Sequence, residues 1–197
     1  MGSATEIAPG LRRWTARHGE WNEDVGSVAA DTRDGLVFID PIAPPAGLGR
    51  PDHVLVTVYW HARDTGALGA GAVWAPVRSA RPLRNREIAV SHAFRAGHDL
   101  PGGIRAFATP RVSEVVFWLP DHGALVVGDV LLGAGAKPNA TDDALRLCPE
   151  RWLGSGTHDD LRAMLAPLLD LPVERVLTSH GEPVLSGGRE ALTRVLA

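Results

Sequence analysis

The sequence predicts one layered α/β domain that spans residues 1–197. A length of 197 residues with 45% hydrophobic residues suits one domain with a two-layer or four-layer core and is too short for two. Short β-like runs recur along the chain up to residue 129. Helical sequence dominates only towards the end. These three observations favour sheets formed by most of the chain and covered by a few helices.

The first half of the chain contains strand patterns separated by turn formers. Residues 27–41 hold two β-like runs on either side of the polar residues 32–35, which is typical of a hairpin. Residues 53–57 (HVLVT) are almost uninterruptedly apolar and rich in β-branched side chains, as in a strand covered on both faces. The elements expected next are a short helix at 62–70, a strand at 72–77, an Arg- and Pro-containing connector, and a strand at 87–90.

Three further strands are expected at 104–109, 114–119 and 124–129. The last two are joined by residues 120–123 (PDHG), a sequence with Pro early and Gly late that suits a tight turn. Residues 133–150 have little periodicity and many turn formers, so a surface loop is expected there.

A helix is expected to begin after Thr157, which can act as its N-cap with Asp160 three residues later. Leucine and methionine side chains then follow the spacing of one apolar face, and the helix should stop at residues 170–172 (DLP). A strand and a loop are expected within 174–184, followed by a closing helix within 186–197.

Composition excludes several classes of partner. The net charge is −3 and the charges are scattered, so we expect no nucleic-acid partner. No apolar stretch is long enough for a membrane-spanning helix, and we expect no membrane association. The first ten residues lack a signal-peptide pattern and Cys148 is the only cysteine, which indicates a reducing cytoplasm. A small-molecule ligand or substrate is the expected partner, and nothing in the sequence indicates an oligomer.

Polar residues follow three of the predicted strands, at 57–64, 128–129 and 179–181. Loops at the C-terminal ends of strands commonly carry the functional site of layered α/β proteins. If the three loops converge, they bring together carboxylates and imidazoles, which are ligands for zinc or iron.

The order of these segments resembles the metallo-β-lactamase fold superfamily from about Val25 onwards. The resemblance rests on Asp40-Pro41 after a hairpin, a V-L-V-T strand end, Gly128-Asp129, and Ser179-His180-Gly181. It implies a four-layer αββα sandwich with two mixed sheets flanked by helices. It also implies a hydrolase of esters, thioesters, lactams or phosphodiesters. Such proteins hold one or two metals with a T-H-x-H-x-D-H motif, a P-G-H element, a bridging Asp and a final His. Asp129 matches the bridging Asp and His180 the final His.

The sequence departs from the family at the other ligand positions. When the T-H-x-H-x-D-H motif is aligned without a gap from Thr57, its four ligand positions fall on Val58, Trp60, Ala62 and Arg63. One inserted residue before His61 recovers the second His and places Asp64 on the last one. Residues 109–112 (TPRV) stand where P-G-H is expected, with Val112 in place of its His. One half of a dinuclear site is therefore absent in either alignment.

Three functions are compatible with this pattern. The leading hypothesis is a metal-independent enzyme or small-molecule-binding relative with catalytic residues Asp129, His180 and Arg63. In it, Arg63 forms an ion pair with Asp129 and replaces the metal, because a nearby fixed cation opposes metal binding. The second is a mononuclear hydrolase of ester or thioester substrates. It would hold one Zn, Mn or Fe ion with ligands from the set His61, Asp64, Asp129 and His180. The third is a non-catalytic structural or interaction protein.

Aromatic residues near these positions suggest a ligand pocket. Tyr59, Trp60 and Trp152 are expected to bind a flat apolar ligand, although each could instead belong to the core. Asp40 is expected to brace the site from beneath, and Cys148 to be an inert apolar residue. Taken alone, Asp129 could merely fix a turn and His180 could be a buried histidine bonded to backbone.

Overall fold

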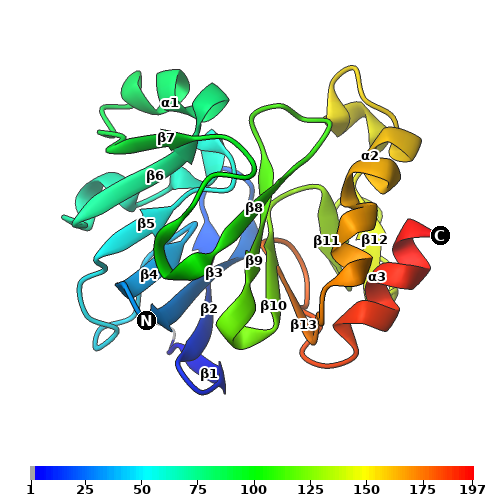
Figure 1. Cartoon of the computed structure of the whole chain (residues 1–197), viewed down its shortest axis with the longest axis horizontal. Helices are drawn as coiled ribbons and strands as arrows, with labels where there is room; N and C mark the ends of the chain where they lie inside the picture. Colours follow the sequence, from blue (N-terminus) through cyan, green and yellow to red (C-terminus); the bar gives the residue numbers. More distant parts are fainter. Residues whose placement is uncertain (1–2) are drawn as a thin grey trace.

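The computed structural model describes residues 3–197, which form two facing β-sheets with helices on the outer sides (Figure 1). The larger sheet has seven strands in the order β1-β2-β3-β4-β5-β6-β7. Its strands are β1 (Thr5–Ala8), β2 (Leu11–His18), β3 (Glu23–Thr32), β4 (Gly35–Ile39), β5 (His53–Leu55), β6 (Ala72–Pro76) and β7 (His92–Phe94). Pairing is antiparallel from β1 to β4 and parallel from β4 to β7, so the sheet is mixed.

The second sheet has four strands in the order β13-β10-β9-β8 and is also mixed, because β13 is parallel to β10 while the other pairs are antiparallel. Its strands are β8 (Arg105–Ala108), β9 (Val115–Leu119), β10 (Ala124–Val127) and β13 (Arg175–Thr178). A separate pair consists of β11 (Leu131–Gly133) and β12 (Leu145–Leu147). The helices are α1 (Val77–Arg84), α2 (His158–Leu165) and α3 (Gly188–Leu196).

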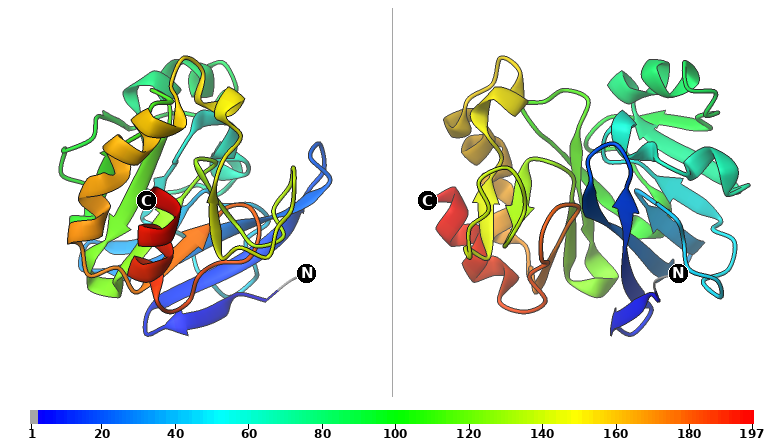
Figure 2. Two further views of the ribbon diagram at one scale, coloured as in Figure 1. Left: turned by 90° about the vertical axis from the view of Figure 1, so that its right-hand side faces the viewer. Right: turned by 180° about the vertical axis from the view of Figure 1, so that it is seen from behind.

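The alternation of side chains along the strands explains the layering. In β9, Val115, Phe117 and Leu119 pack between the two sheets, whereas Val116 and Trp118 pack against the α2 and α3 side. A third apolar cluster covers the outer face of the larger sheet, where Leu83 of α1 contributes. Figure 2 shows α2 and α3 together on the opposite side of the molecule from α1. This arrangement is the four-layer αββα sandwich that the sequence implied.

Most of the predicted elements are confirmed. The hairpin at 27–41 is β3–β4, and the strands expected at 53–57, 72–77, 104–109, 114–119 and 124–129 correspond to β5, β6, β8, β9 and β10. Thr157 caps α2 through a capping box with Asp160. That helix ends at Leu165, and a 3-10 turn then continues to Asp170. The closing strand and helix are β13 and α3.

Four segments differ from prediction. The expected strand at 87–90 is wrong, since the strand lies at His92–Phe94, and the connector before it contains α1 despite its internal Pro82. The expected loop at 133–150 contains β12, which pairs with β11. The helix expected at 62–70 is replaced by two short 3-10 turns, at Tyr59–Ala62 and Thr65–Ala67. These elements are short and stabilised by tertiary contacts, which local periodicity does not reveal.

Cys148 is buried, and burial raises the pKa of its thiol to about 12. Both features are in line with the expectation that Cys148 is an inert residue. Within residues 3–197, no helix combines the length and apolar character needed to cross a membrane.

Candidate metal centre

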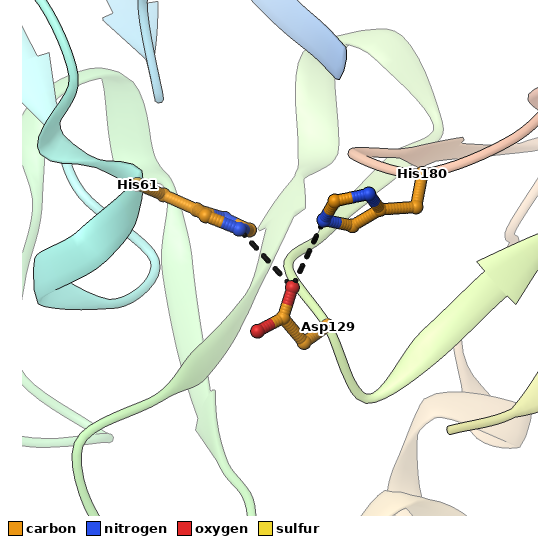
Figure 3. Close-up of side chains that lie close together, drawn as sticks. All are labelled: His61, Asp129 and His180. Carbon is orange, nitrogen blue, oxygen red and sulfur yellow. Dashed lines mark ion pairs between the residues drawn. The ribbon is translucent and has the colours of Figure 1, made fainter. Parts of the chain in front are cut away.

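Three chain segments meet at the edge where the two sheets approach each other. His61 lies in the 3-10 turn that follows β5, Asp129 follows β10, and His180 follows β13. Because β10 and β13 are parallel with Val127 opposite Thr178, both strands deliver their polar residues to the same edge. The sequence expectation that these three loops converge is confirmed (Figure 3).

Two imidazoles point at one carboxylate oxygen. Nε2 of His61 and Nε2 of His180 each lie 3.1 Å from Oδ1 of Asp129. Each residue offers one ligand atom, and the three atoms lie within 4.8 Å of one another. Solvent reaches 0% of the His61 side chain, 8% of His180 and 10% of Asp129. The cluster is thus nearly closed to water.

A carboxylate stands behind each imidazole. Nδ1 of His61 lies 3.2 Å from Oδ2 of Asp40, and Nδ1 of His180 lies 3.4 Å from Oε2 of Glu23. Asp40 also accepts a 2.8 Å hydrogen bond from the backbone N–H of Thr57, so its predicted role as a brace is confirmed. Carboxylates in this position hold the imidazole proton on Nδ1, which leaves the Nε2 lone pair for a metal ion.

The second oxygen of Asp129 is fully engaged. Oδ2 accepts hydrogen bonds from Nε1 of Trp60 at 2.8 Å and from Nη1 of Arg111 at 2.9 Å. The same Nη1 donates to Oε2 of Glu114 at 3.1 Å. Oε1 of Glu114 accepts the backbone N–H groups of residues 129 and 130 at 2.6 and 3.0 Å. The loop that carries Asp129 is therefore fixed from beneath by a buried carboxylate.

The predicted ion pair between Arg63 and Asp129 is wrong. Nη1 of Arg63 donates to the backbone carbonyls of Gly26 and Asp40, at 2.8 and 2.9 Å, and within residues 3–197 it forms no ion pair with Asp129. Arg63 ends a 3-10 turn with a φ of 43°, and its side chain is held by one backbone carbonyl of β3 and one just after β4. Arg111, from the segment aligned with P-G-H, supplies the ion pair instead.

Asp64 also lies outside the cluster. Its Oδ2 accepts a hydrogen bond from the backbone N–H of Ala43 at 2.6 Å, so it braces a loop. Of the four candidate ligands, the structure brings together His61, Asp129 and His180. The alignment with one inserted residue therefore places His61 in the site but assigns a ligand position to Asp64 that it does not occupy.

The charges of the cluster are strongly coupled. Burial disfavours the charged form of His180, but Asp129 and Glu23 outweigh it and raise the pKa to about 9. Complete burial lowers the pKa of His61, but the charge of Asp129 together with hydrogen bonds to Asp129 and Asp40 outweighs burial, so the pKa is raised overall. Burial likewise opposes ionisation of Asp129, yet the two histidines hold its pKa well below the usual range. Burial and the charge of Asp129 raise the pKa of Glu114 to about 7.

A cleft of about 670 Å³ opens over Asp129 and His180. Trp60 and Trp152, both expected to contact a ligand, line it. Tyr59 does not line it and instead packs edge-on against Trp60, with 4.6 Å between ring centroids. The other lining side chains include Trp21, Glu23, Arg86, Arg111 and Lys137.

Sequence reasoning missed four residues of this region: Glu23, Trp21, Arg111 and Glu114. The first two lie at the tip of the β2–β3 hairpin, which was not predicted. The centroid of the Trp21 ring is 5.8 Å from that of His61 and 5.7 Å from that of His180. The only available signal for Glu114 was a carboxylate at the start of an otherwise apolar strand.

The donor set suits one metal ion. In residues 3–197 the buried Nε2 of His61 has no hydrogen-bond partner, although it lies close to Asp129. A buried polar atom without a partner is costly, and a metal ion would satisfy it. Two imidazole nitrogens and one carboxylate oxygen are the ligands of many catalytic zinc and non-haem iron sites.

No protein-family model and no curated protein matches this sequence. Solved structures do match. A metallo-β-lactamase from Hirschia baltica superposes with a TM-score of 0.65 at 13% identity, covering 99% of this chain and 96% of that one. The metallo-β-lactamase FIM-1 from Pseudomonas aeruginosa, in its mono-zinc form, superposes with a TM-score of 0.65 at 13% identity, covering 99% of this chain and 94% of that one. A metallo-β-lactamase family protein from Thermus thermophilus superposes with a TM-score of 0.62 at 16% identity, covering 97% of this chain and 79% of that one. At such identities the likeness concerns the fold alone.

Proposed function

We propose that this chain, which has the metallo-β-lactamase fold, binds one divalent metal ion and hydrolyses ester- or thioester-type substrates. The proposed ligands are His61, Asp129 and His180. The observation that carries the proposal is the convergence of two carboxylate-backed imidazoles on one oxygen of Asp129. Within residues 3–197, Nε2 of His61 is fully buried and has no hydrogen-bond partner, which supports the proposal further.

The site has the composition of a catalytic centre. Three protein ligands leave a coordination position open, and a zinc, manganese or iron ion held by them would acidify a water molecule and polarise a carbonyl. His180 borders the cleft, so that position would face the ligand-binding space. Trp60 and Trp152 would supply apolar surface for a flat acyl or leaving group. The assignment to ester chemistry rests on analogy with the fold.

The surroundings of Asp129 favour one ion over two. Its Oδ2 already accepts hydrogen bonds from Trp60 and Arg111, so only Oδ1 is free to bind a metal. A guanidinium 2.9 Å from the carboxylate also opposes a second cation electrostatically.

A metal-independent binding protein is the second candidate. In the absence of an ion, Asp129 is balanced by Arg111 and by two histidines with raised pKa values, which is an electrostatically self-consistent arrangement. A purely structural role is less well supported, because a cleft opens over Asp129.

Metal analysis separates these candidates. Protein purified without chelator, and protein stripped and then loaded with zinc, manganese or iron, should contain one ion per chain by elemental analysis. His180→Ala should lose both the ion and the hydrolysis of an aryl ester such as p-nitrophenyl acetate. His98→Ala is the matched control, because His98 is exposed and distant in sequence from the three ligands.

Two results would decide against the proposal. Unchanged metal content in His180→Ala would remove the assigned ligand set. Wild-type protein that takes up none of the three metals would favour the metal-independent candidate.

A further inference from the structure

Arg111 is held rigidly at the wall of the cleft. Its Nη1 donates to Asp129 and Glu114, and its Nε donates to the backbone carbonyl of Trp152 at 2.6 Å. Its guanidinium carbon lies 5.0 Å from the centroid of the Trp60 ring. Hydrogen bonds and aromatic contact together fix the plane of the guanidinium, so little conformational freedom remains to be lost on binding.

The bonds of Arg111 leave one nitrogen free. Within residues 3–197 Nη2 donates no hydrogen bond, and it is not one of the buried nitrogens without a partner. The side chain is 12% exposed and lines the cleft beside Asp129 and His180. A positively charged donor is therefore presented to the ligand space next to the proposed metal ligands.

The same guanidinium sits between two carboxylates. Nη1 lies 2.9 Å from Asp129 and 3.1 Å from Glu114, and the Glu114 side chain is fully buried. A divalent cation that bridges two carboxylates would make a comparable set of contacts to oxygen. Unlike such an ion, however, an arginine keeps N–H donors for a further partner.

We infer that Arg111 acts as a built-in cation that binds a negatively charged oxygen of the ligand through Nη2. The ligand class is a flat apolar molecule that carries a carboxylate, or an ester whose carbonyl oxygen gains negative charge during hydrolysis. The aromatic rings of Trp60 and Trp152 would contact its apolar part. The placement beside a metal ion rests on the proposed function, but the binding of an anionic oxygen by Arg111 does not.

The test compares Arg111→Lys with Lys137→Met. The first variant keeps a positive charge near Asp129 and Glu114 but loses the planar set of donors. The second removes the other type of cation at the same cleft, an exposed lysine. Circular dichroism and the thermal midpoint show whether each variant is folded. Should Arg111→Lys be unstable, Arg111→Gln replaces it, since the amide can still donate to a carboxylate.

The first measurement uses metal-free protein and benzoate, with binding followed by quenching of tryptophan fluorescence. We expect saturable quenching in wild type and a dissociation constant raised roughly tenfold or more in Arg111→Lys, as for loss of a hydrogen bond to a charged group. Lys137→Met should change it about threefold or less, because an exposed charge is screened by solvent. This arm needs no metal, so it remains informative if the proposed function fails.

The second measurement uses zinc-loaded protein and a neutral aryl ester. A fall in kcat with little change in KM would assign Nη2 to the oxygen that gains charge in the reaction. A rise in KM for an ester that carries a carboxylate would assign it to the substrate's own anionic group. The inference is overturned if wild type shows no saturable quenching, or if Arg111→Lys affects benzoate binding no more than Lys137→Met.

Discussion

Asp40 is expected to control the affinity of the site for metal without touching the ion. Its Oδ2 lies 3.2 Å from Nδ1 of His61, and solvent reaches only 2% of Asp40 and 0% of His61. As an acceptor, the carboxylate keeps the imidazole proton on Nδ1. The lone pair of Nε2 is then directed towards Oδ1 of Asp129, where the ion is proposed to bind.

Replacing Asp40 with Asn changes this proton arrangement with little change in shape. The amide oxygen can still accept the backbone N–H of Thr57, but the amide nitrogen would face Nδ1 of His61 as a donor. Neutral His61 would then carry its proton on Nε2 and lose its lone pair for the metal. Loss of such a partner typically lowers metal affinity 10–100-fold, or about 1.4–2.7 kcal/mol.

The assay is a zinc titration of metal-free protein in competition with a chromophoric chelator. Asp64→Asn is the matched control, because Asp64 lies three residues after His61 but accepts the backbone N–H of Ala43 instead of a hydrogen bond from a histidine of the site. We expect wild type and Asp64→Asn to bind zinc alike and Asp40→Asn to bind it more weakly. Equal affinity of the two aspartate variants would refute the reasoning.

Two further predictions concern metal-free protein. Glu114→Ala should lower the free energy of unfolding by about 1–3 kcal/mol, because it leaves the backbone N–H groups of residues 129 and 130 without their buried acceptor, whereas Arg111 keeps Asp129 as a partner. Glu114→Gln should cost less, and an unchanged urea midpoint for the alanine variant would contradict this prediction. The second prediction is a loss of stability at alkaline pH. The pKa of His180 is raised from 6.5 to about 9, so its stabilising contribution is complete below pH 6.5 and is lost as pH rises through about 9. The contribution is roughly 3 kcal/mol at most. Urea unfolding across this range should show a larger loss in wild type than in His180→Ala, where only His61 still contributes, and parallel curves would argue against the prediction.

Local sequence patterns were enough to predict much of the fold. Five apolar residues in succession at 115–119 pack on both faces of one strand, and Thr157 with Asp160 forms the capping box that its spacing indicated. The strand and the cap depend on residues close together in the chain, which is why sequence patterns reveal them. The αββα sandwich was implied instead by the resemblance of the segments around Asp129 and His180 to the metallo-β-lactamase fold superfamily.

The identity of the arginine beside Asp129 could not be predicted in this way. Arg63 and Arg111 both lie in segments that the alignment places near the site. Which of the two pairs with Asp129 depends on the direction in which the local backbone points each side chain. Arg63 adopts a positive φ and reaches backbone carbonyls, whereas Arg111 is stacked on Trp60 and points at the carboxylate. Such a choice is set by tertiary packing, which neither periodicity nor motif spacing encodes.

The place where the two sheets meet has a mechanical consequence. His61 lies in the turn after β5 of the larger sheet, Asp129 and His180 follow strands of the smaller sheet, and Val25 of β3 forms a bridge with His180. An ion held by all three would therefore cross-link the two sheets. Its removal should increase local opening between the sheets, and faster hydrogen exchange of the backbone amides around His61, Asp129 and His180 would report that opening.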